Sequence, residues 1–130
     1  IDTRTVQVID PANPKIQEPK RYIWMKAQEA LNGDISLNQE MLAYGSDYHF
    51  LATALQPHGI SIRDKQLRIA TIDHSMWFHQ PFNFDDWLLY CTESPSSGNG
   101  RGLVRGQFFN RQGTLVASAM QEGLMRKVGE

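Results

Sequence analysis

The sequence predicts an α+β fold, a curved and mostly antiparallel sheet of about six strands laid against one long helix. Apolar residues recur at helical spacing over residues 36–55, and several segments with strand alternation follow one another in the C-terminal half. Strands that come in series, rather than alternating with helices, are typical of an antiparallel sheet that packs one face on a helix. We expect one domain over residues 1–130, because this length suits a single core.

The composition narrows the class of protein. The net charge is −1 and charges of both signs are interleaved, so we expect no nucleic-acid partner and no membrane surface. A single cysteine, Cys91, excludes a disulfide framework or a cysteine metal cluster within the chain. No apolar run is long enough to span a bilayer and no signal-peptide pattern is present, which predicts a cytoplasmic protein. The start at Ile1, without an initiator methionine, suggests a fragment or a processed product.

The expected helix covers residues 36–55 without interruption. Ser36 and Gln39 fit a capping box at its start, and Pro57 with Gly59 follows its end. Asp47 lies at the edge of the apolar stripe, where a carboxylate is unexpected. The stripe consists of Leu37, Met41, Tyr44, Tyr48, Leu51 and Leu55.

Six segments have the character of strands, and the last two read as a hairpin through the turn at residues 110–113. Residues 73–82 are aromatic and lack a clean period, so we expect them to be irregular, with Met76, Trp77 and Phe78 in the core or at a subunit interface. The expected strands are residues 5–9, 21–27, 67–72, 87–93, 102–109 and 115–122.

Three polar residues stand where apolar ones are expected. Gln121 shares a strand face with Ala117 and Ala119, and burying its amide without partners costs about 1–3 kcal/mol. A structural amide that bonds backbone at a β-bulge near Gly123 is the plainer reading. Thr71, on a face with Leu67 and Ile69, is explained by strand propensity alone, and Asp47 by solvation. Together, however, a carboxylate, a hydroxyl and an amide are suited to hold and polarise a water molecule.

The histidines do not predict a metal centre. His58, His74 and His79 show none of the spacings of known metal-binding helices, so we expect no metal. Asp73 and His74 are neighbours in an extended segment and should point apart. No nucleophile elbow, phosphate loop or dinucleotide fingerprint occurs.

Longer motifs resemble a known family over residues 19–126. The sequence is similar to the C-terminal half of the acyl-CoA thioesterase II family, whose members are double hotdog proteins. The Asp-His-Ser-Met-Trp-Phe-His segment is the most specific of the shared motifs. They are Leu42-Ala43-Tyr44-Gly45-Ser46-Asp47, Leu55-Gln56-Pro57-His58-Gly59, Ala70-Thr71-Ile72-Asp73-His74-Ser75-Met76-Trp77-Phe78-His79, Trp87-Leu88-Leu89-Tyr90, Gly102-Leu103-Val104-Arg105-Gly106 and Val116-Ala117-Ser118-Ala119-Met120-Gln121-Glu122-Gly123.

This resemblance implies a hotdog fold and the hydrolysis of acyl-CoA to free fatty acid and CoA. It implies no cofactor, no metal and no covalent intermediate, since CoA is part of the substrate. The family's catalytic residues correspond to Asp47, Thr71 and Gln121. In the implied mechanism Asp47 takes a proton from water, while Thr71 and Gln121 orient that water toward the thioester carbonyl. A helix N-terminus or backbone N–H groups would stabilise the oxyanion.

The resemblance also implies a partner. Family members carry two hotdog halves and this chain resembles the second, so we expect it to pair with an N-terminal half or another hotdog subunit, or to form a homo-oligomer. Two alternatives stay open. One is hydration or dehydration of an enoyl thioester, which usually uses a histidine with an acid, and no histidine lies on the helix stripe beside Asp47. The other is a non-catalytic acyl-CoA-binding or structural half.

Overall fold

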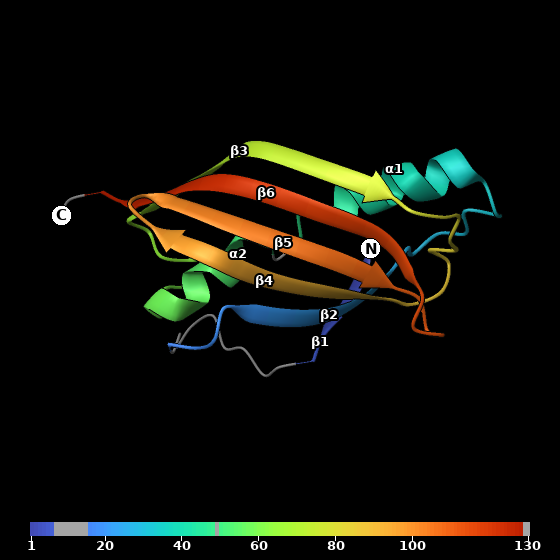
Figure 1. Cartoon of the computed structure of the whole chain (residues 1–130), viewed down its shortest axis with the longest axis horizontal. Helices are drawn as coiled ribbons and strands as arrows, with labels where there is room; N and C mark the ends of the chain where they lie inside the picture. The colour runs from blue at the N-terminus through green and yellow to red at the C-terminus, as the bar shows by residue number, and fades with distance from the viewer. Residues whose placement is uncertain (7–15, 49, 129–130) are drawn as a thin grey trace.

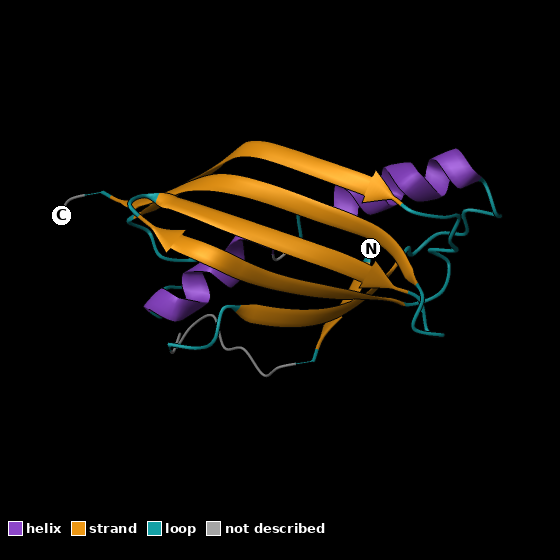
Figure 2. Cartoon of the chain, in the orientation of Figure 1, coloured by secondary structure: helices purple, strands orange, loops and turns teal. Residues whose placement is uncertain are grey.

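The chain folds into two layers, a six-stranded antiparallel sheet and a helical layer on one of its faces (Figures 1 and 2). This computed structural model describes residues 1–6, 16–48 and 50–128. The strand order is β1-β2-β4-β5-β6-β3, and every neighbouring pair is antiparallel. The predicted α+β class and the six strands are therefore confirmed. The strands are β1 (Asp2–Thr5), β2 (Lys20–Lys26), β3 (Leu67–Phe78), β4 (Leu88–Gly98), β5 (Arg101–Phe109) and β6 (Leu115–Lys127).

The helical layer consists of α1 (Ile35–Gly45) and α2 (Phe50–Leu55), which continues into a 3₁₀ turn over Gln56–His58. The prediction of one uninterrupted helix is wrong, because residues 46–48 form a turn. A tertiary contact holds the turn. The Ser46 carbonyl accepts a hydrogen bond from the Tyr90 hydroxyl at 2.7 Å, while the Phe50 N–H bonds the Asp47 carbonyl at 3.3 Å. A continuous helix would need the Phe50 N–H on the Ser46 carbonyl.

The start of α1 also differs from the prediction. Asp34 is the N-cap, and its carboxylate accepts from the Leu37 N–H at 3.0 Å, in place of the expected capping box at Ser36. The predicted apolar stripe is buried only in α2, at Leu51 and Leu55. In α1, Tyr44 is 65% exposed. The core-facing residues of α1 are Asn38, Leu42 and Gly45.

Strand β3 is longer than predicted. Residues 73–78, expected to be irregular, continue the strand, and the pairing with β6 shifts at a bulge between Thr71 and Asp73. A bulge inserts an extra residue and so breaks the two-residue alternation on which strand prediction depends. Strand β4 likewise extends to Gly98.

The predicted strands near residues 21–27, 102–109 and 115–122 correspond to β2, β5 and β6, and the hairpin between the last two is confirmed. The first strand, expected at residues 5–9, is found instead at Asp2–Thr5, and residues 7–9 lie outside the described part of the chain.

The core lies between the sheet and the helical layer. The rings of Tyr90 and Phe108 stack with centroids 3.9 Å apart, and Phe50 from α2 packs against Tyr90. Gly123 allows α2 to lie close to β6, since a Cβ at this position would stand 2.5 Å from the Leu51 methyl groups. Within the described residues, no helix is long and apolar enough to cross a membrane.

Candidate active site

The three residues singled out in the sequence come from three different elements and line one hollow of about 410 Å³. Asp47 lies in the turn between α1 and α2, Thr71 on β3 just before the bulge, and Gln121 on β6. Asp47 and Thr71 are exposed, whereas Gln121 is 1% exposed. The fold therefore brings together the carboxylate, the hydroxyl and the amide.

The buried amide of Gln121 has side-chain partners on both of its polar atoms. Its Nε2 donates to Thr71 Oγ1 at 3.3 Å, and its Oε1 forms a short hydrogen bond with His74 Nδ1. The bulge that we considered near Gly123 lies in the opposite strand, between Thr71 and Asp73. The amide thus bonds other residues of the hollow, in place of the backbone bonds of the plainer reading.

His74 is a site residue that sequence reasoning missed. The bulge restores its side chain to the same face as Thr71, and it stands directly opposite Gln121 in the β3–β6 register. Its Nε2 lies 2.9 Å from Ser46 Oγ, and its ring meets Phe50 edge-on at 5.9 Å between centroids. Alternation in the sequence gives no sign of a bulge. The available signal was Gln121 itself, since a buried amide requires a polar partner on a neighbouring strand.

The turn that carries Asp47 is held by hydrogen bonds of its neighbour Ser46. Ser46 is fully buried, its hydroxyl donates to the Ala43 carbonyl at 2.7 Å, and its own carbonyl accepts from Tyr90. Burial, with a smaller effect of the Asp47 charge, raises the pKa of Tyr90 well above its ordinary value of 10.0. The phenol therefore stays protonated, and it serves as a fixed donor to the turn.

A second hollow adjoins the first and shares Asp47 and Thr71 with it. It has a volume of about 260 Å³, and most of the residues that line it are of apolar type. The carboxylate and the hydroxyl thus stand where the two hollows meet. The further lining residues of the second hollow are Phe50, Leu51, Ala52, Ile62, Ile69 and Ala70.

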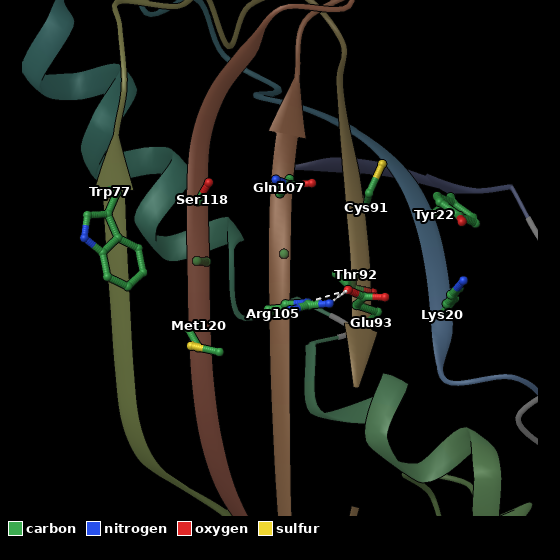
Figure 3. A pocket seen from close by; sticks show the side chains of 12 residues that line it. Lys20, Tyr22, Trp77, Cys91, Thr92, Glu93, Arg105, Gln107, Ser118 and Met120 are labelled. Atoms are coloured by element: carbon green, nitrogen blue, oxygen red, sulfur yellow. Dashed lines mark hydrogen bonds and ion pairs between the residues drawn. The ribbon is translucent and has the colours of Figure 1, made fainter. Parts of the chain in front are cut away.

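A further hollow, of about 510 Å³, lies on the opposite face of the sheet (Figure 3). Lys20, Tyr22 and Trp77 stand on its rim, and Arg105 of β5 pairs across it with Glu93 of β4. It contains none of Asp47, Thr71 and Gln121. Across the residues that the structure describes, no group of three or more histidine, cysteine, aspartate or glutamate side chains is placed to hold a metal ion.

Comparison with known proteins places this chain in a family. A family model described as acyl-CoA thioesterase matches residues 6–124. The chain belongs to the acyl-CoA thioesterase family. Among curated relatives, acyl-CoA thioesterase 2 of Haemophilus influenzae is 42% identical over 125 residues, which cover 96% of this chain and 44% of the relative. Acyl-coenzyme A thioesterase 8 of Mus musculus is 46% identical over 110 residues, covering 84% of this chain and 34% of the relative.

Solved structures of acyl-CoA thioesterases have the same fold. The acyl-CoA thioesterase II of Mycobacterium marinum superposes with a TM-score of 0.81 at 36% identity, covering 98% of this chain and 49% of that one. The PaaI protein of E. coli, at 17% identity and a TM-score of 0.68, shares the fold alone. The hotdog fold that the resemblance implied is confirmed. The chain spans less than half the length of the curated relatives it matches.

Proposed function

We propose that residues 1–130 form a single hotdog unit, the second of a double hotdog acyl-CoA thioesterase, and that this unit carries the residues that hydrolyse the thioester. The observation that carries the proposal is the convergence of Asp47, Thr71 and Gln121 on one hollow, in a chain of this family. The relatives' names supply the substrate class, which is acyl-CoA.

In the proposed reaction a water molecule sits between the three side chains. The Asp47 carboxylate accepts a proton from this water while Thr71 and Gln121 orient it, and the water oxygen attacks the thioester carbonyl carbon. The tetrahedral intermediate then collapses with cleavage of the C–S bond, and the proton held by Asp47 passes to the departing sulfur. The products are a free fatty acid and CoA. We predict that the step requires no cofactor.

We further propose that a second hotdog unit covers the site. Asp47 and Thr71 are exposed, and β3 stands at the edge of the sheet with Ile72 and Trp77 about half exposed. A catalytic carboxylate works best where water is excluded around the reacting atoms. The covering unit would be the N-terminal half of the same protein, another hotdog subunit or a second copy of this chain.

A cytoplasmic location for the protein also remains a prediction.

The alternative reaction, hydration of an enoyl thioester, is less well supported. The helix stripe beside Asp47 carries no histidine, which disfavours enoyl-thioester hydration, but His74 of β3 lines the same hollow. Both of its nitrogens are already engaged, by Ser46 and by Gln121. Neither is therefore available to exchange a proton with a substrate, and hydrolysis through Asp47 remains the better-supported reaction.

The test is the release of free thiol from acyl-CoAs of several chain lengths, measured for this chain alone and mixed with the N-terminal half of a family member. We expect Asp47→Asn to lower kcat on the order of 10²–10⁴-fold, as for loss of a general base. Asp73→Asn is the matched control, an exposed carboxylate on β3 outside the hollow, and should leave the rate unchanged.

Three results would speak against the proposal. Equal rates for wild type and Asp47→Asn would rule out Asp47 as the base. Tight acyl-CoA binding without turnover in either arrangement would identify a non-catalytic half. Loss of enoyl absorbance without thiol release would identify a hydratase.

A further inference from the structure

The reaction proposed above leaves His74 without a task, although it contacts two parts of the site. It reaches from β3 to Ser46, the neighbour of Asp47, and to Gln121 on β6. It therefore bridges the turn that carries the carboxylate and the amide that orients the water.

The protons available at Ser46 determine whether Nε2 of His74 donates or accepts. A serine hydroxyl has one proton to donate, and Ser46 gives it to the Ala43 carbonyl, which can only accept. Toward the histidine, Ser46 Oγ is therefore an acceptor, so Nε2 carries a proton and donates it over 2.9 Å. The buried Ser46 thus determines which way the imidazole faces.

The same count determines what Gln121 can do. Because Nε2 of His74 donates to Ser46, only Nδ1 of His74 faces Gln121. If Nδ1 carries a proton, it requires the amide oxygen of Gln121, and if it presents a lone pair, it requires the amide NH₂. In this structure Oε1 of Gln121 faces Nδ1 of His74, and Nε2 of Gln121 faces Thr71 Oγ1 at 3.3 Å. The imidazole therefore dictates which end of the amide meets the Thr71 hydroxyl.

We propose that His74 is a positioning residue that fixes the orientation of the Gln121 amide, in a chain of hydrogen bonds running from Ala43 through Ser46, His74 and Gln121 to Thr71. The inference rests on the proposed function, since it concerns the residues that orient the attacking water. Without His74 the amide is free to turn over about its last bond, and the donor that meets Thr71 is lost for part of the time. The consequence falls on turnover more than on substrate binding.

Two variants of similar size separate this role from simple packing. The side-chain amide of His74→Asn occupies the place of Nδ1 and reaches Gln121, whereas that of His74→Gln occupies the place of Nε2 and reaches Ser46. We expect His74→Gln to lower kcat on the order of a hundredfold, as misplacement of a reacting group does, with little change in KM. His74→Asn should retain more activity than His74→Gln.

The control is the same pair of substitutions at His79. This residue follows β3, is exposed and bonds Ser118 at 2.9 Å, away from the hollow. His79→Asn and His79→Gln should both turn over at the wild-type rate. If His74→Gln equals or exceeds His74→Asn in kcat, or if both variants change only KM, the positioning role is wrong.

A measurement independent of activity separates this inference from the proposed function. Nitrogen-15 NMR of the wild-type chain should show a proton on His74 Nε2 and slowly exchanging side-chain amide protons for Gln121, and His74→Gln should abolish the slow exchange. A chain that releases no thiol but shows these signals would refute the proposed function and keep the positioning contact. An unprotonated Nε2, or Gln121 signals that ignore His74→Gln, would overturn the inference even in an active enzyme.

Discussion

At the scale of single residues, Tyr90 makes a contact on which the site depends. Tyr90 lies on β4, and its hydroxyl donates to the Ser46 carbonyl. Both residues are fully buried. The Phe50 N–H bonds the Asp47 carbonyl in place of the Ser46 carbonyl, α1 ends at Gly45, and Asp47 is presented at a turn that the Tyr90 hydroxyl helps to hold. The position of the carboxylate thus depends on a residue that never meets the substrate in the proposed reaction.

Tyr90→Phe tests this dependence. Removing the hydroxyl leaves the buried Ser46 carbonyl without its donor, and we expect a loss of about 1–3 kcal/mol in the free energy of unfolding. The freed carbonyl can then bond the Phe50 N–H, which would straighten the turn and lower thiol release. Urea unfolding and the thiol assay measure the two effects. Tyr22→Phe, on the opposite face of the sheet, should leave activity unchanged. A fully active Tyr90→Phe would show that the turn holds without this bond.

At the scale of elements, β4 and β5 lie so close that a side chain at Gly106 would overlap the Tyr90 ring. The ring is held in place by its stacking on Phe108 and by the bond to Ser46. The absence of a side chain at Gly106 therefore leaves room for the Tyr90 ring, whose hydroxyl bonds the turn between α1 and α2.

Gly106→Ala should consequently destabilise the fold by overpacking, by about 1–3 kcal/mol. Gly98, also in the sheet, supplies the control, because nothing lies within 4 Å of a Cβ added there and its φ is not positive. Gly98→Ala should be neutral or slightly stabilising in the same thermal or urea unfolding experiment. Equal stability of the two variants would mean that Tyr90 moves aside at no cost.

The elements also show how far sequence could predict this structure. Gln121 and Thr71 could be selected because a polar residue on an apolar strand face is visible in the sequence, and the hairpin was visible in its turn. The break in the helix was not, since the donor to Ser46 lies 44 residues away in sequence. His74 was missed for a similar reason. A bulge reverses the faces of all later residues in a strand and leaves no local pattern.

At the scale of the whole molecule, two ion pairs join segments that are distant in sequence. Lys127 at the end of β6 lies 3.2 Å from Asp64, and Arg111 of the hairpin turn lies 2.6 Å from Asp86, just before β4. The pKa of Asp64 is lowered by the Gln66 N–H and then by Lys127, and that of Asp86 by Arg111 and then by the Trp87 N–H.

These lowered pKa values predict acid sensitivity. Both carboxylates have an ordinary pKa of 3.8, and a carboxyl group whose pKa falls on folding stabilises the protein above that value. The contribution is lost as the pH drops through the lower, folded-state pKa. Urea midpoints measured from about pH 7 to about pH 3 should therefore fall at the acidic end, and less steeply for Asp86→Asn. Added salt should weaken the difference, since both pairs are partly exposed. An unchanged acid slope in Asp86→Asn would contradict the assignment.

The bulge in β3 has one more consequence, for changes in chain length. Thr71 pairs with Gly123 and Asp73 with Glu122, so Ile72 is the extra residue between two pairs that are adjacent on β6. Deleting it would leave both pairs and all pairs beyond them in register, with Thr71 and His74 still on the same face. Inserting one more residue there would instead require a wider bulge or move His74 away from its place opposite Gln121. At this point we expect the strand to accept the loss of one residue more readily than the gain of one.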